Sequence, residues 1–237
     1  MLKFRNWVNT EKINYYMLSK NPQAIQFLEQ NPDKIAWSAL CANPAAMHLL
    51  QRNQKLIDWR ILSGNPAAIE LLEENLDKAS WFLLAKNPEA LTLLKENPNH
   101  LFWRPFSANP AAIPMLKENP DQIEWETLSE NPAAIQILEE NPHLIDWFGL
   151  SSNPAAMHLL EANLDKVEWV GLCENPAAID LLEENLDKID QHTIYKNPNI
   201  FVYDYEGMKE KTGLFVEELM SAVFHPKNVD KFEEWGF

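Results

Sequence analysis

Residues 65–86 read NPAAIELLEENLDKASWFLLAK, and versions of this 22-residue unit recur along most of the 237-residue chain. The dipeptide Asn-Pro starts each unit, at Asn21, Asn43, Asn65, Asn87, Asn109, Asn131, Asn153, Asn175 and Asn197. A fixed period between about 20 and 50 residues is typical of repeat proteins, in which each unit buries its apolar face against its neighbours. The spacing therefore predicts a stack of equivalent units, whose positions we number 1–22 from this Asn.

The first half of each unit has the pattern of a short helix. Asn at position 1 is a favourable N-cap, and Pro at position 2 suits the first helical turn, where no backbone N–H is needed. Positions 4, 5, 7 and 8 are apolar, as in Ala68, Ile69, Leu71 and Leu72. They cover one side of a helix, and the opposite side, at positions 3, 6, 9 and 10, is rich in acidic residues.

The second half of the unit predicts another short helix, with a second Asn at position 11 as its N-cap. Ile at position 15 and Trp at position 17 point in nearly opposite directions on an ideal helix, so this half has either a wide apolar girdle or a 3₁₀ turn at its start. One Trp per unit at a constant position is the pattern of a buried core. These residues are Trp37, Trp59, Trp81, Trp103, Trp125, Trp147 and Trp169.

Together these patterns predict an all-α protein, an open α-solenoid wound as a right-handed superhelix from repeats of two short helices. Residues 1–20 are expected to be an N-terminal capping half-repeat. Residues 21–206 hold eight repeats and a partial ninth, and residues 207–237 are expected to be a C-terminal helical cap. Pro105 and Pro114 are expected to bend the stack locally, either as a docking notch or through ordinary divergence.

No motif in the chain indicates catalysis or a cofactor. The six glycines form no phosphate-binding loop, and neither a metal-binding His motif nor a nucleophile elbow is present. Cys41 and Cys173 both occupy position 21, six repeats apart, so we expect small packing residues rather than a disulfide. We therefore predict a protein that is not an enzyme and that has no metal site and no cofactor.

The composition limits the partners of the chain. Its net charge of −15 opposes binding to the phosphates of nucleic acid and to anionic membranes. No apolar run is long enough to cross a bilayer, and the first residues lack the apolar segment of a signal peptide. We expect an intracellular monomer whose partner is another protein.

The candidate partner-binding surface is a stripe at positions 14, 18 and 22, which a continuous second helix would leave open. Position 18 differs most between repeats, which indicates either free drift of an exposed position or recognition. Aromatic and Arg side chains dominate interface hot spots, which favours testing the second interpretation. The candidate residues are Leu56, Arg60, Phe82, Arg104, Glu126, Leu144, Phe148 and Val170.

The repeated pattern and the tail ELMSAVFHPKN at residues 218–228 resemble uncharacterised repeat proteins of nucleocytoplasmic large DNA viruses, the giant viruses. A consensus-like engineered repeat is the alternative origin. The resemblance implies a host cytoplasmic setting or association with the virion, and that family has no established activity to carry over. Two functions remain: an adaptor that holds a host or viral protein on an extended surface, or a structural component of the virus particle.

Overall fold

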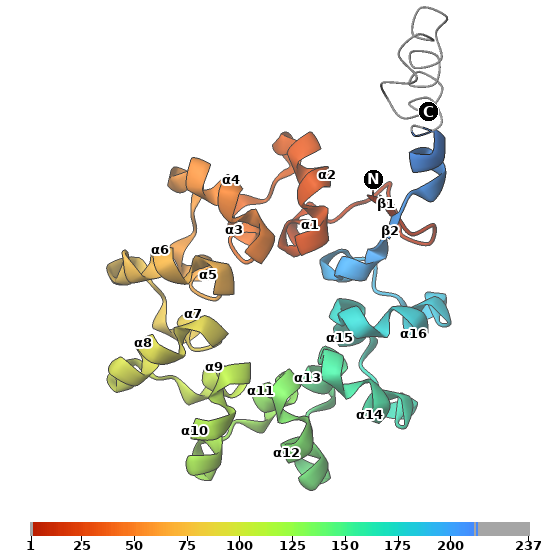
Figure 1. Ribbon diagram of the computed structural model, residues 1–237. Helices are drawn as coiled ribbons and strands as arrows, with labels where there is room; N and C mark the ends of the chain where they lie inside the picture. Colours follow the sequence, from red (N-terminus) through yellow and green to blue (C-terminus); the bar gives the residue numbers. More distant parts are fainter. Residues whose placement is uncertain (1, 211, 213–237) are drawn as a thin grey trace, which may run out of the picture. The chain divides into compact units, whose positions relative to one another are not determined.

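A computed structural model describes residues 2–210 and residue 212. Contacts divide the chain into two compact units. Residues 6–200, all of them described, contain the repeats and are called the repeat body. Residues 1–5 and 201–237 are called the terminal unit. Within the repeat body, short helices form an inner and an outer layer around a common centre (Figure 1).

The first half of every repeat builds the outer layer. A 3₁₀ turn begins at position 2 and leads directly into a short α-helix. The turns are η1 (Pro22–Ala24), η3 (Pro44–Ala46), η5 (Pro66–Ala68), η7 (Pro88–Ala90), η9 (Pro110–Ala112), η11 (Pro132–Ala134), η13 (Pro154–Ala156), η15 (Pro176–Ala178) and η18 (Pro198–Ile200). The helices are α2 (Ile25–Gln30), α4 (Met47–Arg52), α6 (Ile69–Glu73), α8 (Leu91–Glu96), α10 (Ile113–Glu118), α12 (Ile135–Glu140), α14 (Met157–Glu161) and α16 (Ile179–Glu183).

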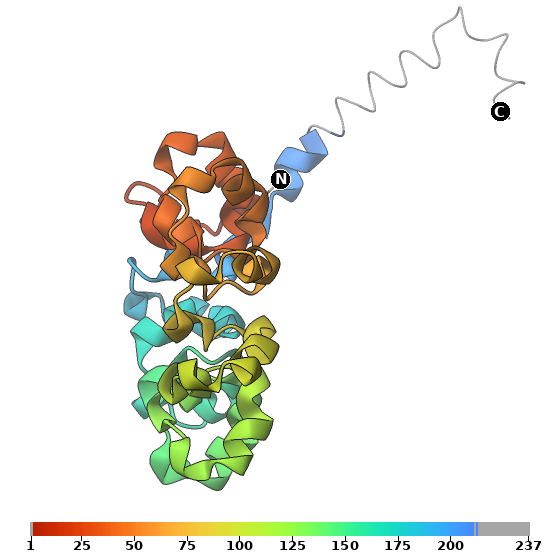
Figure 2. The same cartoon turned by 90° about the vertical axis from the view of Figure 1, so that its left-hand side faces the viewer.

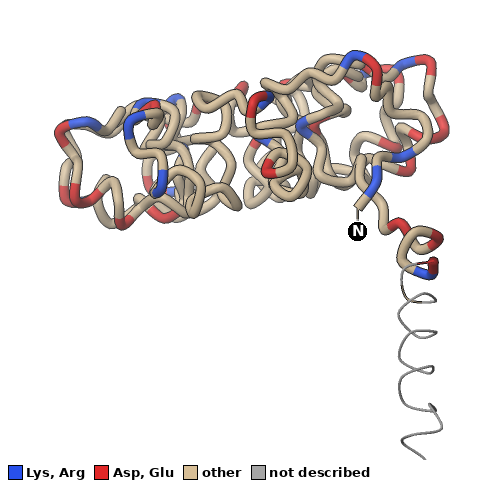
Figure 3. The backbone as a smooth tube through the Cα atoms, turned by 90° about the horizontal axis from the view of Figure 1, so that it is seen from above, with Lys and Arg blue, Asp and Glu red and all other residues tan. Residues whose placement is uncertain are grey.

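Burial in the outer layer follows the predicted apolar arc. Positions 4 and 8, such as Ala24 and Leu28, are fully buried, and positions 5 and 7 are mostly half-buried. The acidic positions 9 and 10 are exposed. Figure 2 shows the repeat body from the side as a flat disc, and Figure 3 shows acidic residues at its outer edge.

The second half of every repeat builds the inner layer. Its α-helices are α1 (Tyr15–Lys20), α3 (Trp37–Leu40), α5 (Trp59–Leu62), α7 (Trp81–Leu84), α9 (Trp103–Ser107), α11 (Trp125–Ser129), α13 (Trp147–Ser151) and α15 (Trp169–Glu174), and the 3₁₀ turn η17 (Ile194–Lys196) takes the ninth place. Their main core residue is at position 20, for example Leu40 and Phe106, which are fully buried.

A 3₁₀ turn begins the second half, which is one of the two predicted alternatives, and a break that was not predicted separates this turn from the α-helix. The half begins with a 3₁₀ turn at positions 12–14, the turns being η2 (Pro32–Lys34), η4 (Gln54–Leu56), η6 (Leu76–Lys78), η8 (Pro98–His100), η10 (Pro120–Gln122), η12 (Pro142–Leu144), η14 (Leu164–Lys166) and η16 (Leu186–Lys188). At Ile35 the backbone is extended, with φ −66° and ψ 120°, and α3 begins at Trp37. Ile35 and Trp37 therefore do not share a helix, so their side chains need not lie on opposite sides of the same helix.

The repeats are joined by a ladder of buried Asn side chains at position 1. The Oδ1 of Asn131 accepts from the N–H of Ala133 as the predicted N-cap. Its Nδ2 donates to the carbonyl oxygens of Ser107 and Asn109, which belong to the two preceding repeats, both at 2.9 Å. The same three bonds recur at every position-1 Asn, and each of these residues is fully buried. The sequence predicts the cap but not the two bonds to the preceding repeats.

The repeat body closes on itself, so the prediction of an open solenoid is wrong. Helix α1 packs against both α3 and η17, and η1 packs against both η3 and η18. Across this seam Asn21 donates to the carbonyl oxygens of Tyr195 at 3.0 Å and Asn197 at 2.8 Å. All the other ladder Asn residues make the same two bonds to the repeats before them, and the nine ladder positions therefore form a circle.

Further bonds cross the seam, and they join the segment predicted as an N-terminal cap to the last repeats. Trp7 Nε1 donates to Glu183 Oε1 at 2.9 Å, and Asn14 Nδ2 donates to the carbonyl of His192 at 3.2 Å. The half-repeat predicted as an N-terminal cap lies between the last and the first full repeats. An outer turn and helix are together longer than an inner helix, so each repeat is a wedge that turns the chain by a ninth of a circle. The sequence gives the repeat length but not this angle.

Position 21 adds a second link between repeats. The Oγ of Ser129 donates to the carbonyl of Trp125 at 2.8 Å and accepts from the N–H of Asp146 in the next repeat at 3.0 Å. At Cys41 the Sγ contacts the equivalent groups at 3.3 Å. The expectation of a small packing residue is therefore incomplete, because this side chain also bonds two repeats together.

The second Asn, at position 11, has a role different from the predicted N-cap. It accepts no capping bond; instead Asn31 Nδ2 donates to the carbonyl of Phe27 at 2.8 Å, at the C-terminal end of α2. The other position-11 residues make the same bond. This explains why Asn persists where Pro at position 12 is replaced.

Pro105 and Pro114 do not interrupt their helices, contrary to the expected local bend. Pro105 is the third residue of α9 and Pro114 the second residue of α10. Both lie in the first turn of an α-helix, where few backbone N–H groups have an intrahelical partner. Helix α10 has the same length as its equivalent α2.

The terminal unit contains a small sheet that the sequence did not predict. β1 (Leu2–Phe4) pairs antiparallel with β2 (Phe201–Tyr203), with Leu2 opposite Tyr203. Lys3 Nζ lies 3.1 Å from Asp204 Oδ1. The repeat pattern thus ends at Ile200 rather than at residue 206. Residues 205–210 are helical, and most of the predicted helical cap at residues 207–237 lies outside the described residues.

Candidate functional site at the centre of the ring

The residues at position 22 line the centre of the repeat body and are called the lumen residues. Each follows the buried positions 20 and 21 of an inner segment and is half-buried. They are Lys20, Ala42, Gly64, Lys86, Ala108, Glu130, Ser152, Glu174 and Lys196. Because the ring is closed, lumen residues from distant repeats face a common space.

Two cavities occupy this space. The first, of about 260 Å³, is lined by Tyr16, Lys20, Ala42, Ile61, Gly64, Leu83, Lys86 and Lys196, and is called the basic cavity. The second, of about 340 Å³, is lined by Glu130, Phe148, Ser152, Val170, Gly171, Glu174 and Lys196, and is called the acidic cavity. Lys196 contributes to both cavities.

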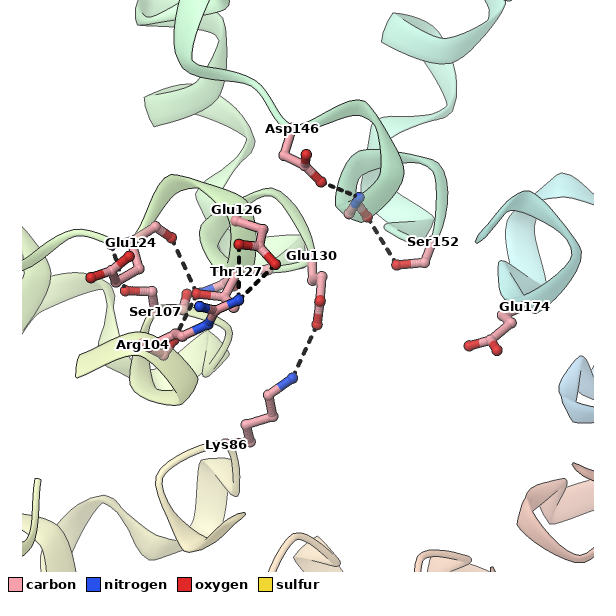
Figure 4. A network of polar contacts seen from close by, with 12 residues as sticks. Lys86, Arg104, Ser107, Glu124, Glu126, Thr127, Glu130, Asp146, Ser152 and Glu174 are labelled. Carbon is pink, nitrogen blue, oxygen red and sulfur yellow. Dashed lines mark hydrogen bonds and ion pairs between the residues drawn. The ribbon is translucent and has the colours of Figure 1, made fainter. Parts of the chain in front are cut away.

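Ion pairs connect some of the charged lumen residues. Lys86 Nζ lies 3.2 Å from Glu130 Oε2, two repeats further along the ring (Figure 4). The intervening lumen residue, Ala108, is small, which leaves room for this contact. Lys196 pairs with Glu174 in the preceding repeat. All four side chains are partly exposed to solvent, so these pairs contribute little to stability.

Lys20 has a different environment. Its Nζ lies 4.7 Å from the centre of the Tyr16 ring, a cation–π geometry. Burial lowers the pKa of Lys20, and the positive charge of Lys196 lowers it further, while Glu174 acts in the opposite direction. The positive charge of Lys20 is therefore less favourable in the folded protein than in water.

The inner layer differs in charge from the chain as a whole. Positions 17–22 of the nine inner segments carry a formal charge of +2, whereas the whole chain carries −15. The acidic residues lie mostly in the outer layer, where positions 9 and 10 are exposed. The ring thus has a weakly positive interior and a negative outside.

The residues at position 18 form a row on the inner helices, called the rim row, which borders the two cavities. Tyr16 belongs to the lining of the basic cavity, and Phe148 and Val170 to that of the acidic cavity. In the middle of the row, Arg104 Nη2 donates to both carboxylate oxygens of Glu126, at 2.8 and 2.9 Å (Figure 4).

Six of the eight candidate residues lie on the rim row, and each is exposed: Arg60, Phe82, Arg104, Glu126, Phe148 and Val170. The other two, Leu56 and Leu144, are at position 14, and the structure separates them from the row. Position 14 ends a 3₁₀ turn before the break, so it does not share a helix with position 18. The predicted stripe at positions 14, 18 and 22 is wrong in this respect.

Position 14 lies instead beside the Trp of the preceding repeat. Lys78 Nζ lies 4.5 Å from the centre of the Trp59 ring, and the His100 ring stacks on Trp81 at 4.6 Å. The same arrangement occurs for Lys166 with Trp147 and Lys188 with Trp169. All seven Trp side chains are half-buried, so the prediction that they form the buried core is also wrong.

Sequence reasoning included position 22 in the stripe but selected none of its residues. Lysine, glutamate, alanine and glycine alternate there without a regular pattern. Lys20, Lys86 and Lys196 belong to the first, fourth and last inner segments, which an open stack would hold apart. Only ring closure brings them to one cavity, and no signal in the sequence indicates closure.

Metal ligation and thiol chemistry find no support in the part of the chain that is described. Residues 2–210 and 212 contain no group of three or more His, Cys, Asp or Glu side chains placed to hold a metal ion. Cys41 and Cys173 are free and buried, and burial raises the pKa of both thiols. Such thiols are poor nucleophiles at neutral pH.

No described helix has both the length and the apolar character needed to span a bilayer. Neither a protein-family model, a curated protein nor a solved structure matches the chain.

Proposed function

We propose that the protein is a non-enzymatic scaffold that holds a protein partner on its rim row. The exposure of large side chains on this row is the observation that supports the proposal. Phe82, Phe148 and Val170 expose 47%, 57% and 45% of their surface on one row, and apolar residues that gather on one surface mark interaction sites better than scattered ones do. They lie on the position that varies most between otherwise similar repeats.

The surroundings of the row also suit a protein interface. The row combines aromatic side chains with the Arg104–Glu126 ion pair, and aromatic and Arg residues contribute most to interface hot spots. Phe82 contacts Phe102 edge to face at 5.7 Å, which extends the apolar surface beyond the row. A partner that covers this surface would bury apolar area beside a polar pair.

The proposal includes an intracellular setting and a monomeric ring. The resemblance to giant-virus repeat proteins supports a host or viral protein as the partner. A structural role in the virus particle remains the alternative, and a partner identified among virion proteins would favour it.

Site-specific photo-crosslinking tests the proposal. A photoreactive phenylalanine analogue at Phe148 should capture the partner, whereas the same analogue at Leu164 should not. Leu164 is a fair control because it exposes 50% of its surface but lies at position 12, off the row. Equal capture at both positions, or no capture at Phe148, would contradict the proposal.

Binding of the captured partner then tests the row quantitatively. The double variant Phe82→Ala/Phe148→Ala should weaken binding by about tenfold or more, as expected when hot-spot side chains are truncated. The control Leu164→Gln/Leu186→Gln introduces the residue found at Gln54, the same repeat position, and should change affinity by less than about twofold. Thermal unfolding should be nearly unchanged in both variants.

A further inference from the structure

Three lysines meet at the basic cavity, although they belong to separate repeats. Lys20, Lys86 and Lys196 line it, and none of the residues that line it is acidic. The carboxylates that pair with Lys86 and Lys196 belong to the acidic cavity instead. Three lysines thus face two carboxylates, so the basic cavity keeps an excess of one positive charge in a protein that is strongly acidic elsewhere.

This positive charge is only partly compensated. Lys20 contacts the face of Tyr16, which offsets a positive charge less than a carboxylate would. Burial lowers the pKa of Lys20, and neighbouring Lys196 adds to the effect, while Glu174 offsets it only in part. An anion in the cavity would remove this penalty, because an opposite charge nearby favours the protonated amine.

The wall of the cavity between the lysines is apolar. Ile61 and Leu83, both at position 19, line it together with Ala42 and Gly64. At position 19 most other repeats carry small or compact residues, and at Gly149 an added Cβ would lie 2.8 Å from the carbonyl oxygen of Glu126. The larger side chains at Ile61 and Leu83 thus form a local apolar surface beside the charged groups.

We propose that the basic cavity binds a small organic anion, with its phosphate or carboxylate group at Lys20, Lys86 and Lys196 and its apolar body against Ile61 and Leu83. A lysine ammonium serves as a point charge for such groups, and a mostly apolar pocket with a few polar groups is typical of small-molecule sites. The volume of about 260 Å³ suits a small molecule rather than a polymer. This site is independent of the partner proposed for the rim row.

Titration calorimetry with phenyl phosphate, a compact aryl phosphate, tests the proposal on the full chain. It should bind with a dissociation constant of about 1 mM or lower, and inorganic phosphate should bind about tenfold more weakly because it lacks the apolar body. Lys20→Met should weaken phenyl phosphate binding about tenfold or more, since a hydrogen bond to a charged group is lost. Lys95→Met removes an exposed lysine of α8 and should leave the affinity within about twofold.

The stability of the variants shows whether a loss of binding comes from unfolding. Lys20→Met should melt at or above the wild-type temperature, because it removes a charge that burial and Lys196 make unfavourable. A phosphotyrosine peptide distinguishes the sources of the anion. If the peptide binds as tightly as phenyl phosphate does, the anion is a side chain of a partner protein. If it binds about tenfold more weakly, the anion is a free small molecule. The proposal would be overturned if phenyl phosphate did not bind at a concentration about tenfold above the expected dissociation constant. It would also be overturned if Lys20→Met and Lys95→Met lost affinity for phenyl phosphate equally.

Discussion

Replacing Asn109 with aspartate separates the two roles of the buried Asn ladder. The Oδ1 of Asn109 accepts from the N–H of Ala111 at 2.9 Å, and aspartate can keep that capping bond. Its Nδ2 donates to the carbonyl oxygens of Ala85 and Asn87, both at 2.9 Å, and aspartate cannot make these bonds. Asn and Asp are about equally good N-caps, so a capping role alone predicts almost no change.

The ladder role predicts a large loss. For Asn109→Ala, a buried acceptor without its donor costs ~1–3 kcal/mol and the lost cap ~1 kcal/mol, so the free energy of unfolding should fall by ~2–4 kcal/mol. The carbonyl of Asn87 also accepts from the N–H of Ala90, so it keeps one partner, and the estimate counts only one orphaned acceptor. Asn109→Asp should be the worse variant, because it places a buried carboxylate against two carbonyl oxygens.

The pH dependence of Asn109→Asp gives a second check. The buried carboxyl should have a folded-state pKa above its unfolded value of about 3.9, so the folded state binds the proton more tightly. The loss of stability should be full at neutral pH and should shrink as the pH falls through the raised pKa.

Urea unfolding followed by circular dichroism measures both effects. Asn99→Asp is the control, because Asn99 is exposed and position 13 carries Asp in other repeats, such as Asp121. It should change the free energy of unfolding by less than ~0.5 kcal/mol. An Asn109→Asp protein as stable as the wild type at pH 7 would refute the ladder.

Three further substitutions test the packing between repeats. Gly149→Ala should destabilise the protein by ~1–3 kcal/mol, since a Cβ there would lie 2.8 Å from the carbonyl oxygen of Glu126. Gly64→Ala would place its Cβ no closer than 3.7 Å to any atom and should be neutral or stabilising by up to ~1 kcal/mol. Thermal unfolding that ranks the two variants in the reverse order would contradict the packing. Ala85→Ser should stabilise the protein by ~0.5–1.5 kcal/mol, because the new hydroxyl can accept from the N–H of Phe102, as the Ser hydroxyl at position 21 does in other repeats. A lower unfolding midpoint in urea would show that position 21 does not link repeats in this way.

The sequence predicts the unit of this fold well, because local patterns determine it. The Asn-Pro starts, the apolar arc at positions 4, 5, 7 and 8 and the helical class all follow from helix geometry within one repeat. The 3₁₀ turn at the start of the second half was one of two interpretations, since the pattern at positions 15 and 17 suits both a wide girdle and such a turn. The extended backbone at Ile35 settles it.

Features that depend on the angle between repeats could not be predicted. If the angle between successive repeats were slightly larger or smaller, the repeats would form an open spiral instead of a ring. No single residue determines the total of these angles. Closure makes the presumed N-terminal cap a neighbour of the last repeat and brings Lys20 beside Lys196. The exposure of the rim row was predicted because it is local to one helix, but the basic cavity was not.

Contacts of the Asn21 side-chain amide measure ring closure most directly. In NMR spectra of labelled protein, the Nδ2 protons of Asn21 should show nuclear Overhauser effects to Tyr195 and Asn197, whose carbonyl oxygens lie 3.0 and 2.8 Å from Nδ2. Their intensities should match those from Asn131 to Ser107 and Asn109, which report an ordinary repeat interface. Effects that are present for Asn131 but absent for Asn21 would show an open chain of repeats and contradict the ring.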